Sequence, residues 1–442
     1  MNCISPIDGR YADITKPLSE YFSEFAFFRY RLYVEFVYFC ELSKVIPELQ
    51  NITSTDTINI MNIFHNFNCD NFNTIKEKEK IINHDIKALE YFIQIEFKKI
   101  GLEQYISFIH FAITSQDINT SANVISLKEC ITNLIVPAIN KIIDYISTLS
   151  FNMKNDVMLA FTHGQPAVPT IMGKELYVFK YRLEEQLDIF IKMPFTTKFG
   201  GAIGNFNAHY AAYPHINWNI FSDNLVKNMG LNREKVTTQI SNYDNLCNIF
   251  NMIKTINNII NDMNIDFWLY ISKGYLKQKI NDNEIGSSTM PQKVNPINFE
   301  NSEGNICIAN SIINGITNKL SISRLQRDLT DSTILRNIGT ILSYSYISYE
   351  STYKGLTKID INRVIIKKEL MYNNNILAEG VQTILRKHML TDAYEKLHNL
   401  TRNNFDNNKL NYFISSLPLN IQKEISNITL DTYYGKCNLL DI

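Results

Sequence analysis

The chain has 442 residues, of which 45% are hydrophobic and 20% charged, and its formal net charge is −1. This composition predicts a soluble globular protein of two or three domains, and the near-neutral charge argues against nucleic acid as a partner. Any anion recognition must therefore be local. The start, MNCISPIDGR, lacks a basic segment followed by an apolar run, and no uncharged stretch suits a membrane helix. We therefore expect a cytoplasmic protein without a membrane partner.

Apolar residues recur at helical spacing in four segments along the chain, 121–150, 171–193, 246–271 and 300–320. Pro137 should kink the first of these helices or mark a break in it. Clear alternating strands joined by Asn-Gly or Asp-Gly turns are missing. We therefore predict an all-α fold whose middle is a bundle of long helices, extended by oligomerisation.

Two changes in pattern suggest domain boundaries, one near residue 112 and one near residue 355. They predict an N-terminal helical domain (1–112), a central long-helix bundle (113–355) and a C-terminal helical domain (356–442). The seven cysteines show no close pairs, and no HExxH motif is present, so we expect neither a disulfide framework nor a metal site. Residues 200–204, GGAIG, lack the context of a nucleotide-binding fold and predict a tight turn.

Three polar motifs occur in the first 120 residues. Ser5 to Tyr11 places Arg10 and Tyr11 on a non-helical arm. Asn83-His84-Asp85 and Thr114-Ser115-Gln116-Asp117 each precede a helical stretch. Helix capping explains both, but hydroxyls and free amides at a helix start also suit an anionic ligand.

The motif Thr162-His163-Gly164-Gln165-Pro166 holds a histidine in a turn. Such a histidine is a candidate acid or base, because its ordinary pKa lies near neutrality. The alternative is a structural histidine held by hydrogen bonds.

Two later segments suit anionic groups. The loop from Gly286 to Pro296, GSSTMPQKVNP, offers backbone N–H groups, hydroxyls and Lys293 to a carboxylate. Residues 323–336 contain three arginines and Ser332, which could bind a phosphate through fork-like hydrogen bonds. The alternative for this second segment is a solvated helix face with Arg–Asp pairs.

The loop 286–296 resembles the fingerprint GSSxMPxKxNP of the aspartase/fumarase superfamily. Together with SPIDGRY, NHD, TSQD, THGQPA, GNFNAHYAAYP and SRLQRDLTDSTILRN, it is similar to the bacterial adenylosuccinate lyases over residues 5 to about 337. Two positions depart from that pattern: Gln292 stands where His is frequent, and Gly200-Gly201 where Asn-Gly is more usual.

The resemblance implies an all-helical, three-domain subunit that forms a homotetramer, with each active site built from three subunits. It implies β-elimination of fumarate from the nucleotide adenylosuccinate, giving AMP, and from SAICAR, giving AICAR, in purine biosynthesis. No cofactor and no metal are implied.

The resemblance also implies roles for individual residues. Ser287 would be the base, His163 would protonate the departing nitrogen, and His84 would assist in position or charge. The substrate-binding residues would be Arg10, Tyr11, Asn83, Asp85, Thr114, Ser115, Gln239, Ser288, Lys293, Asn295, Asn301, Arg327, Ser332 and Arg336. Among these, Lys293 and Asn295 would hold the succinyl carboxylates, and Arg10, Tyr11, Arg327, Ser332 and Arg336 the phosphate.

Two alternatives stay open at this point. Argininosuccinate lyase or fumarase activity would need no nucleotide phosphate site, so the DGRY arm and the arginine segment argue against both. A non-catalytic structural relative would be expected to have lost the reactive side chains, yet Ser287, His163, His84 and Lys293 are all present.

Overall fold

The computed structural model describes residues 2–279, 290, 293–401 and 407–436. The chain forms two compact units, each with its own hydrophobic cluster. Unit 1 contains residues 1–139, 185–258 and 302–350, and unit 2 contains residues 140–184, 259–301 and 351–442. The two domain boundaries suggested by the sequence, near residues 112 and 355, stay a prediction.

Helices dominate the described residues, as the sequence predicts. Those wholly in unit 1 are α1 (Ala12–Thr15), η1 (Lys16–Leu18), α2 (Ser19–Phe22), α3 (Glu24–Leu42), η2 (Pro47–Leu49), α4 (Ser54–His65), α5 (Cys69–Ile82), α6 (Asp85–Lys99), η3 (Glu103–Phe108), α7 (Ser115–Cys130), η4 (Ile131–Ile135), α10 (Asn207–Ala212), α11 (Trp218–Asn228) and α14 (Thr330–Leu335). Those wholly in unit 2 are α16 (Arg363–Tyr372), η5 (Asn374–Leu377), α17 (Ala378–Lys387), α18 (Ala393–Thr401), α19 (Asn407–Ser415) and α20 (Leu419–Ser426).

Five helices contain the points at which the chain passes from one unit to the other. They are α8 (Val136–Asn152), α9 (Met172–Phe190), α12 (Asp244–Ser272), α13 (Ile297–Leu320) and α15 (Ile338–Thr357). The apolar periodicity predicted α9, α12 and α13 to within a few residues. With 29 residues, α12 is roughly 44 Å long, because an α-helix rises about 1.5 Å per residue.

The predicted helix 121–150 is part of one helical stretch, Ser115–Asn152, made of α7, η4 and α8. The expected break at Pro137 takes the form of the π turn η4, whose wider hydrogen bonding accommodates a residue that has no N–H. This stretch is also long and apolar enough to cross a membrane, and 44% of its apolar window is buried inside the structure. Core helices of soluble proteins pass the same test.

Within the described residues, three two-stranded sheets accompany the helices. They are β1 (Val157–Thr162) with β2 (Gln165–Ile171), antiparallel; β3 (Thr196–Thr197) with β4 (Asn232–Arg233), parallel; and β5 (Leu276–Gln278) with β6 (Ile359–Ile361), antiparallel. The hairpin β1–β2 carries no Asn-Gly or Asp-Gly signal, and its second strand contains Pro166 and Pro169. Proline is rare in strands, which explains why the sequence pattern does not indicate this hairpin.

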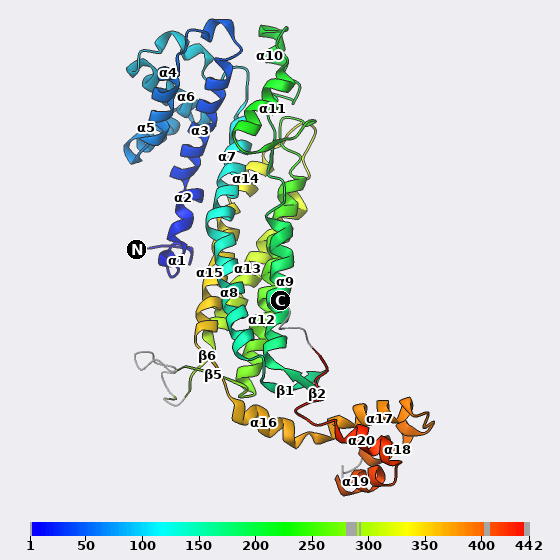
Figure 1. The fold of residues 1–442 in the computed structure, drawn as a ribbon. Helices are drawn as coiled ribbons and strands as arrows, with labels where there is room; N and C mark the ends of the chain where they lie inside the picture. The colour runs from blue at the N-terminus through cyan, green and yellow to red at the C-terminus, as the bar shows by residue number, and fades with distance from the viewer. Residues whose placement is uncertain (1, 280–289, 291–292, 402–406, 437–442) are drawn as a thin grey trace. The chain divides into compact units, whose positions relative to one another are not determined.

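Helix α3 is largely buried in unit 1 and lies beside α7 (Figure 1). Its apolar residues, among them Phe28, Phe36 and Phe39, pack in an aromatic-rich core. It also carries a polar stripe, Arg31, Glu35 and Tyr38, whose spacing of four and three places them on one face. A buried polar stripe needs partners, and these lie around the candidate site described below.

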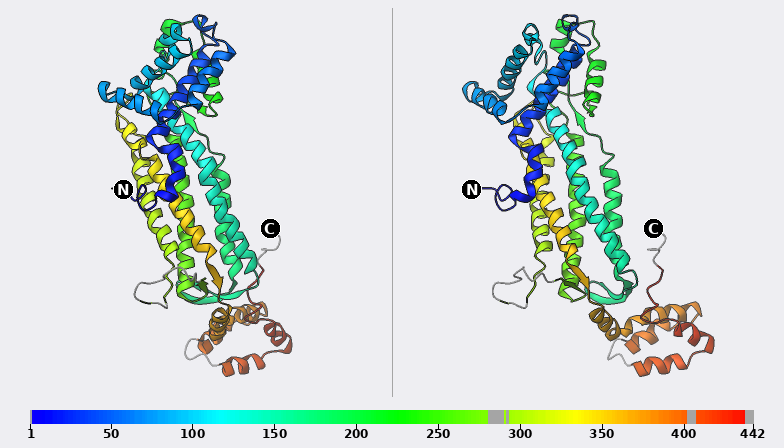
Figure 2. Two further views of the ribbon diagram at one scale, coloured as in Figure 1. Left: turned by 90° about the vertical axis from the view of Figure 1, so that its left-hand side faces the viewer. Right: turned by 60° about the vertical axis from the view of Figure 1, so that its left-hand side comes forward.

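The N-terminal helices α3 to α6 form one group when seen from two further sides (Figure 2). The C-terminal helices α17 to α20 pack around a smaller cluster that includes Val381, Leu385 and Leu397. The parts of helices α12, α13 and α15 that lie in unit 1 share a buried polar network. Asn257 donates to Asn310 at 3.1 Å and accepts from the Tyr349 hydroxyl at 2.7 Å.

Candidate active site

A cavity of about 830 Å³ in unit 1 brings together most of the predicted residues of that unit. Four segments line it: α2 with the start of α3, the corner between α5 and α6, the start of α7, and the segment that contains α14. Seven predicted site residues are in its lining: Asn83, His84, Asp85, Ser115, Arg327, Ser332 and Arg336.

The first three of these residues, Asn83, His84 and Asp85, lie at the corner between α5 and α6. Asn83 ends α5 in the left-handed conformation, with φ 54° and ψ 38°, which asparagine tolerates better than most residues. His84 caps α6, because its Nδ1 accepts a hydrogen bond from the Lys87 N–H at 3.1 Å. Both roles are capping roles, as the sequence allowed, yet the same residues line the cavity. In a neutral imidazole the accepting nitrogen has no proton, so Nε2 of His84 carries it.

Asp85 is held by Arg31, which sequence reasoning did not identify. The Arg31 Nη2 lies 2.6 Å from Asp85 Oδ2, and its Nε donates to Asn119 at 2.8 Å. The guanidinium also stacks over the Phe27 ring at 3.9 Å from the centroid. Burial alone would raise the pKa of Asp85, but Arg31 and the N–H of Ile86 lower it below its ordinary value. Asp85 is therefore a fixed carboxylate at a helix start, where negative charge is favourable.

The start of α7 presents two hydroxyls, Thr114 and Ser115. Thr114 caps the helix, and its N–H and hydroxyl both donate to Asp117, at 2.8 and 3.1 Å. Gln116 donates to the Ser332 hydroxyl at 3.1 Å and so joins α7 to the arginine segment. Capping and cavity lining therefore coexist at this helix start: Thr114 and Asp117 form the cap while Ser115 lines the cavity.

The first part of the arginine segment does not form the solvated helix face that the sequence left open as an alternative. Residues 323–329 are a loop between α13 and α14 and not a helix face, and Leu325 has a positive φ of 51°. Arg324 still pairs with Asp328, at 3.0 Å. The Arg327 Nη1 instead donates to Gln239 at 2.8 Å, which brings this predicted residue beside the cavity. For the Arg336 side chain, which is exposed, no hydrogen-bond or ion-pair partner is found among the described residues.

Arg10 and Tyr11 lie in unit 1 but do not line the cavity. The N–H of Tyr11 donates to the Pro6 carbonyl at 2.9 Å in the turn that precedes α1, and the Arg10 side chain is exposed. The predicted arm is therefore a short turn followed by α1, and the role of its two side chains stays a prediction.

His163 lies in unit 2, at the tip of the β1–β2 hairpin. Thr162 pairs with Gln165, so His163 and Gly164 form a two-residue loop, with φ of 54° and 70°. Positive φ at both positions is the requirement of a type I′ turn. A histidine in this conformation is uncommon, and such strain is found often at functional positions. The ring is exposed, and no hydrogen-bond partner for it is found among the described residues.

The remaining predicted residues belong to the fingerprint loop and to α13 in unit 2. Lys293 is exposed, Asn295 and Asn301 are half-buried, and the N–H of Lys293 donates to the Met290 carbonyl at 3.0 Å. Ser287, Ser288 and Gln292 lie outside the described residues.

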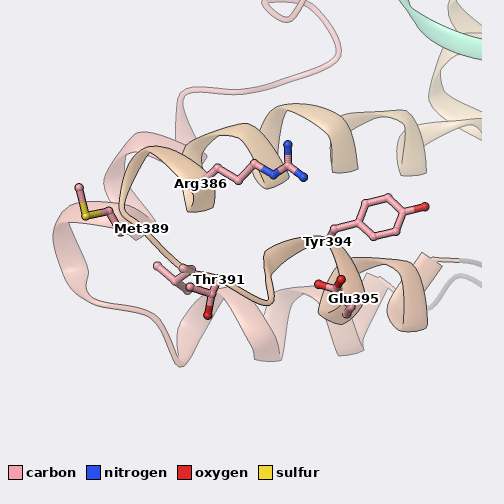
Figure 3. Close-up of a pocket in the computed structure, with 6 residues that line it drawn as sticks. Arg386, Met389, Thr391, Tyr394 and Glu395 are labelled. Carbon is pink, nitrogen blue, oxygen red and sulfur yellow. The ribbon is translucent and has the colours of Figure 1, made fainter.

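A second cavity, of about 360 Å³, lies in unit 2 between the end of α17 and the start of α18 (Figure 3). Its labelled residues include Arg386, Tyr394 and Glu395, and it contains none of the predicted site residues. The larger cavity is therefore the better candidate site.

Sequence reasoning missed several residues of that cavity. Its aromatic wall, Tyr21, Phe22, Phe27 and Phe28, looks like ordinary core in the sequence. Arg31 and Asn119 gave no signal beyond being polar residues in helices with many apolar neighbours. The wall and the guanidinium groups together offer stacking surface and charge-assisted hydrogen bonds, which suit an aromatic, anionic ligand.

Comparison with known proteins gives matches over nearly the whole chain. The family described as "Lyase" matches residues 9–309, and the one described as "Adenylosuccinate lyase C-terminal" matches residues 323–434. The chain is 42% identical to the adenylosuccinate lyase of Buchnera aphidicola subsp. Schizaphis graminum and 44% identical to that of Legionella pneumophila (strain Philadelphia 1). Both alignments cover 98% of this chain and 97% of the relative.

Solved structures resemble the chain in fold. The fumarate lyase from a Mesorhizobium species gives a TM-score of 0.75 at 14% identity, with 95% of each chain covered. The β-carboxy-cis,cis-muconate cycloisomerase from Acinetobacter calcoaceticus gives 0.73 at 14% identity, with 96% of each chain covered. At this identity the likeness supports the predicted fold alone.

Proposed function

The chain belongs to the adenylosuccinate lyase family of the aspartase/fumarase superfamily, and from this premise we propose that it releases fumarate from adenylosuccinate and from SAICAR. The products would be AMP and AICAR, and the enzyme is a lyase of purine nucleotide biosynthesis.

The reaction needs three kinds of group. A base removes a proton from the carbon next to one succinyl carboxylate, and hydrogen-bond donors stabilise the negative charge that results. The C–N bond then breaks, the electron pair stays on nitrogen, and an acid supplies a proton to it. Ser287 is proposed as the base, and His163 as the acid. Lys293 and Asn295 are proposed to hold the succinyl carboxylates.

One observation carries the assignment of the nucleotide end: a single cavity gathers Arg327, Arg336, Ser115 and Ser332. Two guanidinium groups with hydroxyls beside them form a suitable binding site for a phosphate, because each arginine offers a planar fork of donors. The aromatic wall beside them suits a purine ring.

We also propose a cytoplasmic homotetramer with active sites shared between subunits. Helix α12 leaves Ile265, Trp268 and Leu269 exposed, and Trp268 and Leu269 follow Ile265 by three and four positions, which places them on one face. Such a face favours burial against another copy. Light scattering tests the assembly. Mixing Ser287→Ala and His163→Gln proteins after mild dissociation should restore activity if their sites combine residues of different subunits.

An absorbance assay tests the reaction. Purified protein should convert adenylosuccinate to AMP and fumarate, without added metal. Failure to do so, with argininosuccinate or malate consumed instead, would overturn the assignment.

A further inference from the structure

The carboxylate of Asp117, inside unit 1, is completely buried and accepts hydrogen bonds from five donors, one of them the Thr114 hydroxyl described above. Its Oδ1 accepts from the Lys198 Nζ at 2.7 Å and from the N–H groups of Gly200 and Gly201 at 2.8 and 3.1 Å. Its Oδ2 accepts from the Thr114 N–H at 2.8 Å. The side chain of Lys198 is also completely buried, and its Nζ donates to the Gly201 carbonyl at 2.6 Å.

A buried ion pair is favourable only when its hydrogen bonds are satisfied. Burial alone would raise the pKa of Asp117, but Lys198 and the N–H groups of Thr114 and Gly200 lower it below its ordinary value. Asp117 is therefore ionised in the folded protein. The roles proposed above for the reaction leave this pair unused, so its place in the structure needs another explanation.

The glycine loop that Asp117 binds lies directly against the segment that leads to Gln239. Gly204 has a φ of 83°, and a Cβ on it would lie 2.3 Å from the Thr237 carbonyl oxygen and 2.9 Å from that of Thr238. Only glycine allows this approach. Two residues earlier, the Ala202 carbonyl accepts from the Gln239 Nε2 at 2.9 Å.

Hydrogen bonds of Gln239 connect the glycine loop to the arginine segment. Its Oε1 accepts from the Arg327 Nη1 at 2.8 Å, and its N–H donates to the Gln326 carbonyl at 3.3 Å. A continuous path of hydrogen bonds and backbone therefore runs from Thr114, through Asp117 and the glycine loop, to Arg327. Both ends of this path are proposed substrate-binding residues.

We propose that the Asp117–Lys198 pair is a positioning element that fixes the start of α7 and Arg327 relative to one another before substrate binds. The inference rests on the proposed function for the identity of the ligand. Its physical content is preorganisation: residues that are already fixed lose less freedom when the nucleotide arrives, so affinity rises.

The test removes both charges together, because removing one would leave the other buried and unpaired. In the double variant Asp117→Asn, Lys198→Met, the asparagine oxygen still accepts from a glycine N–H, but its amide group cannot accept from Thr114. We expect the KM for adenylosuccinate to rise about 10-fold or more while kcat changes less, as loss of uniform binding predicts. AMP binding by calorimetry should weaken by a similar factor.

A matched control separates positioning from lost stability. Tyr349→Phe removes a buried hydrogen bond to Asn257, in a network that contains no proposed site residue. It should lower the melting temperature and leave KM unchanged. An equal rise of KM in both variants, or an unchanged KM in the double variant, would overturn the proposal.

Hydrogen exchange gives a readout that needs no turnover. In the double variant, peptides covering 237–241 and 325–328 should exchange faster, together with 198–204. Faster exchange confined to 198–204 would show a merely local role and contradict the inference. If the unmodified protein fails to cleave adenylosuccinate, the proposed function fails, and the exchange pattern still decides whether Asp117 fixes Arg327.

Discussion

Two turns of this protein each hold a histidine, and they hold it differently. At the α5–α6 corner of unit 1, the Nδ1 of His84 accepts from the Lys87 N–H and so forms part of a helix cap. At the β1–β2 tip of unit 2, the turn fixes the backbone of His163 and leaves the ring exposed.

The difference indicates that the two histidines have different roles. The Nδ1 of His84 is occupied by the hydrogen bond that caps α6, so Nε2 is the ring nitrogen left to donate a hydrogen bond. Its Nδ1 also lies 4.0 Å from Asp85 Oδ1, which is too long for a hydrogen bond. The exposed ring of His163 takes part in no hydrogen bond seen in the described residues. The comparison therefore supports the proposal that His163 transfers a proton and that His84 has a positioning role.

The largest loss of kcat is expected when the proposed base is removed, and the losses at both histidines can be compared with it. Ser287→Ala should lower kcat by several orders of magnitude, because it deletes the hydroxyl proposed to remove the carbon-bound proton. Steady-state kinetics measures kcat, and calorimetry with adenylosuccinate should show that binding persists. Normal turnover in this variant would mean that the base is another residue.

His163→Gln should lower kcat by about 10²- to 10⁴-fold, the usual contribution of a positioned acid or base. Glutamine can donate a hydrogen bond but cannot give up a proton, so the variant isolates proton transfer. The limb of the pH–rate profile that reports this acid should disappear. A loss similar to that of His84 variants would remove the distinction between the two turns.

His84 can be tested with two substitutions that differ in capping. Asparagine is a strong N-cap and alanine is not, so His84→Ala should destabilise the fold by about 1 kcal/mol more than His84→Asn. Both lose the Nε2 donor, and each should lower kcat/KM by about 10- to 150-fold, the value of one hydrogen bond to a charged group. Thermal melting and kinetics measure the two effects separately. Full activity in His84→Asn would leave His84 with a capping role alone.

The smallest loss of kcat is expected from a substitution in the backbone of the β1–β2 turn that holds His163. Gly164→Ala places a Cβ at φ 70° with no atom within 4 Å, so only backbone strain of about 1–2 kcal/mol opposes it. We expect kcat to fall a few-fold as His163 shifts. The control is Gly101→Ala, which has φ 76° and equally open surroundings. It should show a similar loss of melting temperature with kcat unchanged; an equal loss of kcat in both would mean that the turn does not position His163.

Much of the fold is predictable because its signals are local. The apolar stripes of α9, α12 and α13 need only helical spacing, and the THGQP motif lies in a turn, as expected. The hairpin around that turn was not predictable, because its loop is His-Gly and its second strand contains prolines. Loop residues 323–329 resembled a helix face, because Arg324 and Asp328 have helical spacing although the backbone there is not helical.

The family resemblance names the candidate site residue by residue, but it does not predict the contacts that connect these residues. Asp117 looks like a capping residue, and it does interact with Thr114. Its partner Lys198 is 81 positions further along the chain, and no local pattern links the two. The ion pair between Arg31 and Asp85 could not be predicted for the same reason, because the two residues lie on different helices.

The prolines of β2 have a consequence for how the protein behaves at high concentration. A two-stranded sheet exposes edges that can pair with strands of other chains and start aggregation. Pro166 and Pro169 have no N–H to offer an incoming strand, so this edge of the hairpin is a poor template. The hairpin can therefore present His163 on an exposed tip without becoming a site of edge-to-edge association.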